Sequence, residues 1–142
     1  MNWKVENESS IPDVAAEISK FIPKKGIVLF DAEMGSGKTT LIRSLLSIIT
    51  FEEFQGSPTY SLVNEYLSKQ NKPIYHFDLY RLKDEKELFD IGFEDYLTDN
   101  ALLFIEWPEK SLKFLPDNIY WVYIRVDDNN HRLIELKHDN RS

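Results

Sequence analysis

The spacing of hydrophobic residues predicts two buried strands with a helix between them. Continuous apolar runs of strand length occur at 26–32 (GIVLFDA) and 101–107 (ALLFIEW). Such runs are typical of parallel strands that are buried on both faces. The segment that begins at Lys38 has helical spacing instead. Its apolar side would consist of Leu41, Leu45, Ile48 and Ile49.

Another helix is predicted near the N-terminus, over 9–22 (SSIPDVAAEISKFI). Ser10 and Asp13 have the spacing of a capping box, and Pro12 suits the first helical turn. Pro23 is expected to end this helix, because proline cannot continue the hydrogen-bond pattern. The apolar face would consist of Ile11, Val14, Ile18, Phe21 and Ile22.

Strand-like segments separated by turn residues predict two hairpins in the rest of the chain. The first would join 60–68 to 73–82, and the second would join 118–126 to 132–138. Short helices are also expected, over 84–97 with a break near Gly92, and over 108–115.

This order of elements predicts an α/β fold of the P-loop NTPase type. Parallel strands would form the centre of a mixed sheet, with antiparallel strands outside and helices on its faces. The chain has 142 residues, of which 42% are hydrophobic, enough for one core. We therefore expect residues 1–142 to form a single P-loop ATPase domain.

The turn after the first buried strand has the pattern of a phosphate-binding loop. The sequence GSGKTT at 35–40 fits the end of G-x-x-x-x-G-K-[ST], with Ala32 at the first glycine position. Backbone N–H groups of such a loop form a nest for anions, and the following helix N-terminus adds positive charge. Alanine there would cost about 1–2 kcal/mol only if its φ were positive. The residues expected to bind nucleotide are Glu33, Met34, Gly35, Ser36, Gly37, Lys38, Thr39 and Thr40.

A phosphate-binding loop needs an acidic partner, and the sequence offers two. Lys38 would reach the β- and γ-phosphates of ATP, and Thr39 would hold Mg²⁺. Asp78 follows an alternating strand, whereas Glu106 ends a buried one. Ligands of open α/β sheets bind beyond the C-terminal ends of the strands, which Glu106 fits best. Either carboxylate can serve on the acidic side of the metal.

Other residues near the predicted site have an ordinary structural alternative. Thr59 lies in GSPTYS (56–61), where nucleotide switches have a loop that orders around Mg²⁺, although a serine–proline–threonine turn can simply be rigid. Trp107 and Tyr80 can stack on an adenine or pack within the protein. The sequence NKPI at 71–74 lacks the acid of a guanine-binding N-K-x-D signature, which disfavours a GTPase.

Composition narrows the possible partners. The 17 Lys and Arg against 24 Asp and Glu give a net charge of −7, so a role on nucleic acid is expected to run through a partner. The chain has no cysteine, which excludes disulfides. The polar N-terminus and the absence of long apolar runs predict a cytoplasmic protein without a membrane span.

Four stretches together resemble the TsaE (YjeE) family. They read, in order, GSGKTTLIRSLL, SPTYSLVNEY, YHFDLYRL and FIEWPE. The resemblance implies an ATPase that binds ATP and Mg²⁺ and hydrolyses ATP slowly. It also implies an accessory role in threonylcarbamoyl modification of tRNA adenosine. The partners would be TsaB and TsaD, a heterodimer that the ATPase resets between cycles and through which it meets tRNA.

The resemblance also implies roles for individual residues. Lys38 and Thr39 match phosphate and Mg²⁺ ligands, with Thr40 in support. Thr59 matches the switch-like loop. Asp78 and Glu106 match the acidic side of the metal site, and Trp107 matches the aromatic residue of the E-W pair in the family motif.

Two other functions use the same loop. A small-molecule or nucleotide kinase would also bind Mg²⁺ and ATP, but such enzymes often have an arginine-rich lid. The arginines here are scattered, and Arg81 alone is expected near the site. A regulatory module that binds nucleotide without turnover is the other alternative, against which the complete set of Lys38, Thr39, Asp78 and Glu106 weighs.

Overall fold

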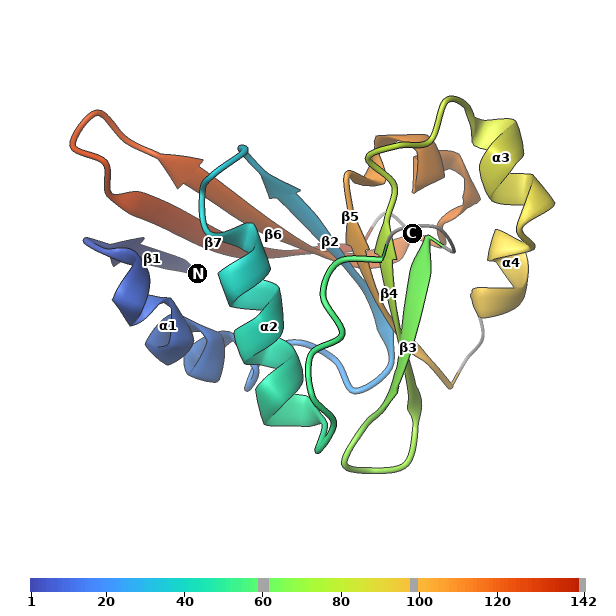
Figure 1. The fold of residues 1–142 in the computed structure, drawn as a ribbon, viewed down its shortest axis with the longest axis horizontal. Helices are drawn as coiled ribbons and strands as arrows, with labels where there is room; N and C mark the ends of the chain where they lie inside the picture. The colour runs from blue at the N-terminus through green and yellow to red at the C-terminus, as the bar shows by residue number, and fades with distance from the viewer. Residues whose placement is uncertain (59–61, 98–99, 141–142) are drawn as a thin grey trace.

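A seven-stranded sheet with the order β1-β7-β6-β2-β5-β4-β3 forms the centre of the molecule (Figure 1). The computed structural model describes residues 1–58, 62–97 and 100–140. Strands β6, β2, β5 and β4 run parallel, while β1, β7 and β3 pair antiparallel to their neighbours. The expected mixed sheet with a parallel centre is confirmed. The strands are β1 Asn2–Val5, β2 Gly26–Ala32, β3 Val63–Leu67, β4 Pro73–Asp78, β5 Leu102–Glu106, β6 Asn118–Val126 and β7 Arg132–Asn140.

Helices cover both faces of this sheet. On one face α1 (Ile11–Ile18) packs beside α2 (Lys38–Ile49), as Figure 1 shows. The short helices α3 (Glu85–Asp90) and α4 (Phe93–Tyr96) contribute to a second core on the other face. The remaining helical segments are the 3₁₀ helices η1 Glu8–Ser10 and η2 Pro108–Phe114.

The continuous apolar runs have a simple explanation, because alternate side chains of a strand point to opposite faces. In β5, Leu102 and Phe104 join the core under α1 and α2. Leu103 and Ile105 join the core that contains α3 and α4. The next residue, Glu106, has the same parity as Phe104. Its side chain is therefore directed to the face that α2 covers.

The N-terminal region differs from the prediction in three respects. Residues Asn2–Val5 form an edge strand on β7 that the polar sequence did not predict. Ser10 has helical backbone angles at the end of η1, and its side chain makes no capping hydrogen bond. Helix α1 ends at Ile18, well before Pro23, because Lys20 and Phe21 donate to carbonyls three residues back and tighten the chain. The side chain of Phe21 is consequently exposed.

The other predicted elements are present. Both hairpins form, as do the strands at 26–32 and 102–106 and the helix from Lys38. The helical segment at 84–97 is broken at Gly92, which caps α4 in the left-handed conformation. The helix predicted over 108–115 is a 3₁₀ helix, in which the buried Ser111 hydroxyl donates to the carbonyl of Pro108.

Candidate nucleotide-binding site

The glycine loop joins the end of β2 to the start of α2, at the top of the view in Figure 1. Gly35 and Gly37 have φ values of 74° and 97°, in the left-handed region that glycine adopts without strain. The N–H of Ser36 donates to the carbonyl of Glu33, which closes a tight turn. Ala32 belongs to β2 and is not among the residues with positive φ, so alanine costs little at this position.

The N-terminal segment supports the loop from behind. A Cβ placed on Gly37 would lie only 2.5 Å from Cδ1 of Ile11. The Thr40 hydroxyl donates to Oε1 of Glu8 at 2.8 Å. The start of α2 is thus attached to η1 and α1, and the hydroxyl of Thr40 is engaged by protein.

Lys38 lies against Glu106, across the mouth of the loop. Nζ of Lys38 is 3.3 Å from Oε1 of Glu106, and their side chains are 11% and 3% exposed. Oε2 of the same carboxylate lies 2.6 Å from Nε2 of His76, which is fully buried. Since a carboxylate accepts hydrogen bonds, we assign the proton of His76 to Nε2. Both oxygens of Glu106 are therefore held by neighbours.

Asp78 stands beside this pair on the neighbouring strand. It occupies the same register as Glu106 in the parallel pairing of β4 with β5. Its Oδ1 accepts a hydrogen bond from the N–H of Tyr80 at 3.0 Å. Burial raises the pKa of the Asp78 carboxyl, and the nearby charge of Glu106 raises it further, against the lowering influence of the Tyr80 N–H and of Lys38. The two candidate acids are thus neighbours, and Glu106 is the one that contacts Lys38.

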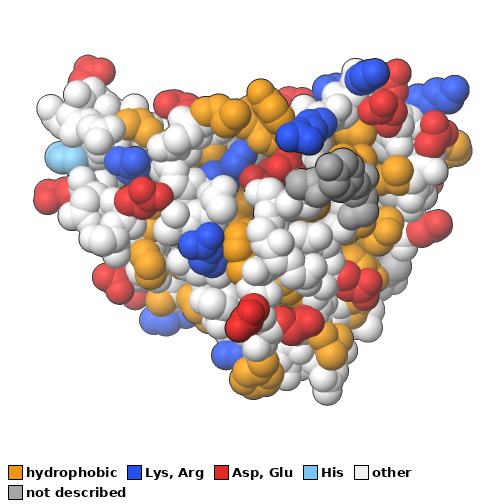
Figure 2. All heavy atoms as spheres, in the orientation of Figure 1, with side chains coloured by type: hydrophobic (Ala, Val, Ile, Leu, Met, Phe, Trp, Pro, Cys, Tyr) orange, Lys and Arg blue, Asp and Glu red, His pale blue; other side chains and the backbone are white. Residues whose placement is uncertain are grey.

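Aromatic rings border the lysine. Nζ of Lys38 lies 4.1 Å from the centroid of the Trp107 ring, a cation–π arrangement. The ring of Tyr80 lies 5.0 Å from that of Trp107 and is largely exposed. Trp107 has a φ of 54°, unusual for a bulky residue, at the turn from β5 into η2. Figure 2 shows hydrophobic, basic and acidic side chains gathered at the upper centre of this face, beside the loop.

The structure does not place all of the predicted residues in contact. Glu33, Met34 and Thr39 are exposed along the loop and the first turn of α2. Thr59 lies outside the described residues. Just before it, Ser57 and Pro58 line a cavity of about 150 Å³. The same cavity is lined by Leu62, Asp78, Tyr80 and Arg81.

Sequence reasoning missed three residues at the site. His76 had a usable signal, because it precedes Asp78 by two positions in a strand and must share its face. Glu8 had none. The expectation that Arg81 alone lies near the site was wrong, because Arg132 contacts the loop. Its Nε and Nη2 donate to the carbonyls of Ser36 and Gly35 at 3.3 and 3.4 Å. Arg132 is distant in the sequence and reaches the loop only through the sheet.

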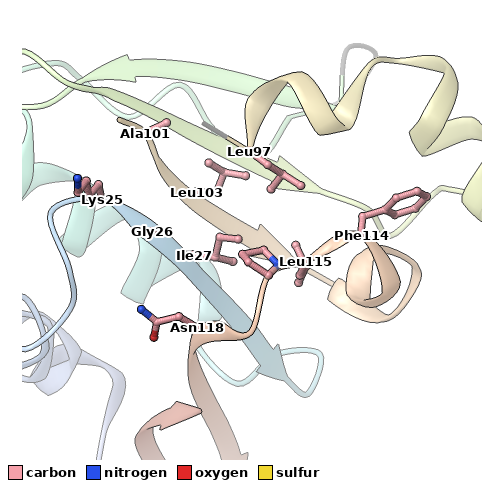
Figure 3. A pocket seen from close by; sticks show the side chains of 10 residues that line it. Lys25, Gly26, Ile27, Leu97, Ala101, Leu103, Phe114, Leu115 and Asn118 are labelled. Atoms are coloured by element: carbon pink, nitrogen blue, oxygen red, sulfur yellow. The ribbon is translucent and has the colours of Figure 1, made fainter. Parts of the chain in front are cut away.

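Another cavity, of about 560 Å³, lies at the opposite ends of the parallel strands (Figure 3). Its lining includes the starts of β2 and β6, at Gly26 and Asn118. Of its lining residues in the described part of the chain, Lys25 alone carries a charge. The contact between Lys38 and Glu106, with Asp78 beside it, lies instead at the carboxyl ends of the strands. No helix within the described ranges has the length and apolar character needed to cross a membrane.

The strand, the glycine loop and the helix that begins with Lys38 place the fold in the class of P-loop proteins. A model of the family described as "Threonylcarbamoyl adenosine biosynthesis protein TsaE" matches residues 5–134. The chain belongs to the TsaE family.

Individual relatives agree with this assignment. The chain is 43% identical over 118 residues to the tRNA threonylcarbamoyladenosine biosynthesis protein TsaE of Haemophilus influenzae, covering 82% of this chain and 73% of that protein. The protein of the same name from Rickettsia typhi is 32% identical over 142 residues, covering 96% and 94%. The crystal structure of Bacillus subtilis YdiB superposes with a TM-score of 0.75 at 18% identity, covering 99% and 85%, and supports the fold.

The two loop glycines should differ in their response to alanine. Gly37→Ala should be destabilised by more than about 1–2 kcal/mol, the cost of a left-handed residue, because its Cβ would also collide with Ile11. Gly35→Ala should carry the conformational cost alone, since a Cβ at this position would meet nothing within 4 Å beyond its chain neighbours. Thermal unfolding of both variants measures the difference. Equal losses would show that Ile11 does not limit the space behind the loop.

Replacing Asp78 by asparagine should stabilise the metal-free protein at neutral pH. The folded-state pKa of Asp78 lies above its ordinary value of 3.8, so the folded protein binds more protons between those two pH values. The wild type must lose stability as pH rises through this window. Asp78→Asn lacks this loss and keeps an acceptor for the Tyr80 N–H. Thermal unfolding in EDTA should show a melting temperature above that of the wild type at pH 7, and the difference should become smaller towards pH 4. If the difference in melting temperature between Asp78→Asn and the wild type became larger at acidic pH, the pKa of Asp78 could not be raised in the folded protein.

Proposed function

We propose that this protein binds ATP with Mg²⁺ and hydrolyses it in support of tRNA threonylcarbamoyladenosine biosynthesis. The observation that carries the proposal is the Lys38–Glu106 contact of 3.3 Å at the mouth of the glycine loop. The contact places a lysine that would bind phosphate against a buried carboxylate. A magnesium nucleotide has both a negative part and a positive part, and these two charges would complement them. Membership of a family whose relatives are named for this modification supplies the pathway.

The residues present fit a magnesium nucleotide. The first N–H groups of α2 have no partners within the helix and suit a phosphate. The Ser36 hydroxyl is buried and has no hydrogen-bond partner among the described residues, so the loop holds an unused polar group. The described residues contain no group of three or more His, Cys, Asp or Glu side chains that could hold a metal ion. That suits Mg²⁺, which usually takes one or two carboxylates together with phosphates and water.

Each residue of the site would have a separate role in binding the magnesium nucleotide. Lys38, now held by Glu106 and Trp107, would turn to the phosphates. Thr39, Asp78 and Glu106 would supply the oxygen atoms for Mg²⁺, which neutralises charge on the phosphates when bound. His76 fixes the orientation of Glu106 through a buried hydrogen bond of 2.6 Å. Trp107 lies beside the lysine, with its ring centroid 4.1 Å from Nζ.

The partners belong to the same proposal. We place the protein in the cytoplasm, where it would act on a TsaB–TsaD heterodimer and reset it between cycles. It would meet tRNA through that complex, because a net charge of −7 does not suit a protein that holds a nucleic-acid backbone itself.

Lys38→Ala should abolish the ATP-dependent stimulation of tRNA modification by TsaB and TsaD. The substitution removes the cation at the loop, whereas Lys24→Ala removes an exposed lysine before β2 and should leave stimulation intact. The measurement is threonylcarbamoyl transfer to tRNA with purified partners. Full stimulation by Lys38→Ala would refute the proposed function. A phosphorylated small molecule accumulating with ATP use would favour a kinase instead.

Glu106→Gln should separate binding from turnover. The amide keeps an oxygen near His76 but loses the negative charge, so Lys38 is no longer neutralised by it. Nucleotide affinity should be retained or increased, while hydrolysis falls by about 100-fold, as for loss of one electrostatic group in a buried site. Calorimetric binding of ADP and a phosphate-release assay measure the two effects. Unchanged turnover would assign the metal role to Asp78.

A further inference from the structure

Arg132 is the first residue of β7, and its guanidinium reaches the backbone of the glycine loop. Nε donates to the carbonyl of Ser36 and Nη2 to that of Gly35, at 3.3 and 3.4 Å. Nη1 donates to the carbonyl of Asn130 at 3.0 Å, within the β6–β7 turn. The guanidinium thus bridges the loop and the C-terminal hairpin.

The charge of Arg132 is not neutralised by a carboxylate among the described residues. The arginine on the neighbouring strand provides the contrast, because Arg125 forms an ion pair of 3.1 Å with Asp31. The three acceptors of the Arg132 guanidinium are backbone carbonyls. An uncompensated positive charge therefore stands beside a loop whose backbone geometry suits an anion.

The two loop contacts also orient the peptide groups. In a trans peptide, the carbonyl of one residue and the N–H of the next point in opposite directions. Holding the carbonyl of Ser36 towards Arg132 turns the N–H of Gly37 away from it. Glycine has a wide choice of backbone conformations, so a loop with Gly35 and Gly37 gains order from an external restraint.

The position of Arg132 is itself fixed by the sheet. Ala32, the last residue of β2, pairs with Ile124 of β6. Two residues further, Val126 pairs with Arg132 of β7. The end of β2 and the start of β7 are therefore held two strands apart at the same edge, and the long side chain spans the rest.

We propose that Arg132 is a positioning residue for the phosphate loop. It holds the loop backbone in the conformation that accepts an anion, and it adds positive charge beside it. This inference rests on the proposed function, since the anion would be the phosphates of the nucleotide.

The test compares Arg132→Ala and Arg132→Lys with Lys137→Ala. Lys137 is exposed on the same strand, so its loss changes the net charge equally without touching the loop. Arg132→Ala should weaken binding of Mg–ADP by about tenfold or more, the value of one hydrogen bond to a charged group. The affinity of Arg132→Lys for Mg–ADP should lie between those of the wild type and Arg132→Ala, because lysine keeps the charge but not the paired N–H geometry. Lys137→Ala should bind like wild type.

Hydrogen exchange of the nucleotide-free protein gives a readout independent of nucleotide. The amides of Gly37 and Lys38 should exchange faster in Arg132→Ala than in the wild type. In Lys137→Ala their exchange rates should equal those of the wild type. Wild-type protein that fails to bind Mg–ADP would refute the proposed function, while the exchange experiment would still test the hold on the loop. Loop exchange that is unchanged in both Arg132 variants would overturn the proposal, even if binding weakened, because charge alone would then suffice. Should Arg132→Ala fail to fold, Arg132→Lys carries both measurements.

Discussion

The alternation of side chains along β4 and β5 is the constraint on which the candidate site depends. Each strand sends every second residue to the face covered by α2. On β4 those residues include His76 and Asp78, and on β5 they end in Glu106. A shift of either strand by one residue would move its acids to the opposite core, away from Lys38. The apolar residues that set this register therefore also set the chemistry.

The loop is held by elements from both ends of the chain. Glu8 and Ile11 contact its rear on the side of α1, and Arg132 contacts its carbonyls from β7. The two supporting segments are also joined to each other, because β1, which precedes η1, pairs with β7, which begins at Arg132. The geometry of a short glycine-rich segment thus depends on a network that spans the fold, as is general for a preorganised site.

Local pattern was enough for much of this fold. Continuous apolar runs located β2 and β5, and alternation with turn residues located both hairpins. The short edge strand β1 escaped, because its four residues are mostly exposed and have little apolar periodicity. The acids Asp78 and Glu106 were found through their positions at strand ends. Arg132 and Glu8 were not, because their contacts with the loop region arise from tertiary pairing between segments distant in sequence.

The buried contact between Lys38 and Glu106 makes each residue the counter-ion of the other. Removing one partner from such a pair leaves a buried charge without compensation. An anion that bound Lys38 alone would leave Glu106 without its counter-ion, and a cation that bound Glu106 alone would leave Lys38 without its counter-ion. A ligand that brings both signs at once leaves neither unbalanced. For the metal–nucleotide complex that we propose as the ligand, the metal ion and the nucleotide should therefore each increase the affinity of the site for the other.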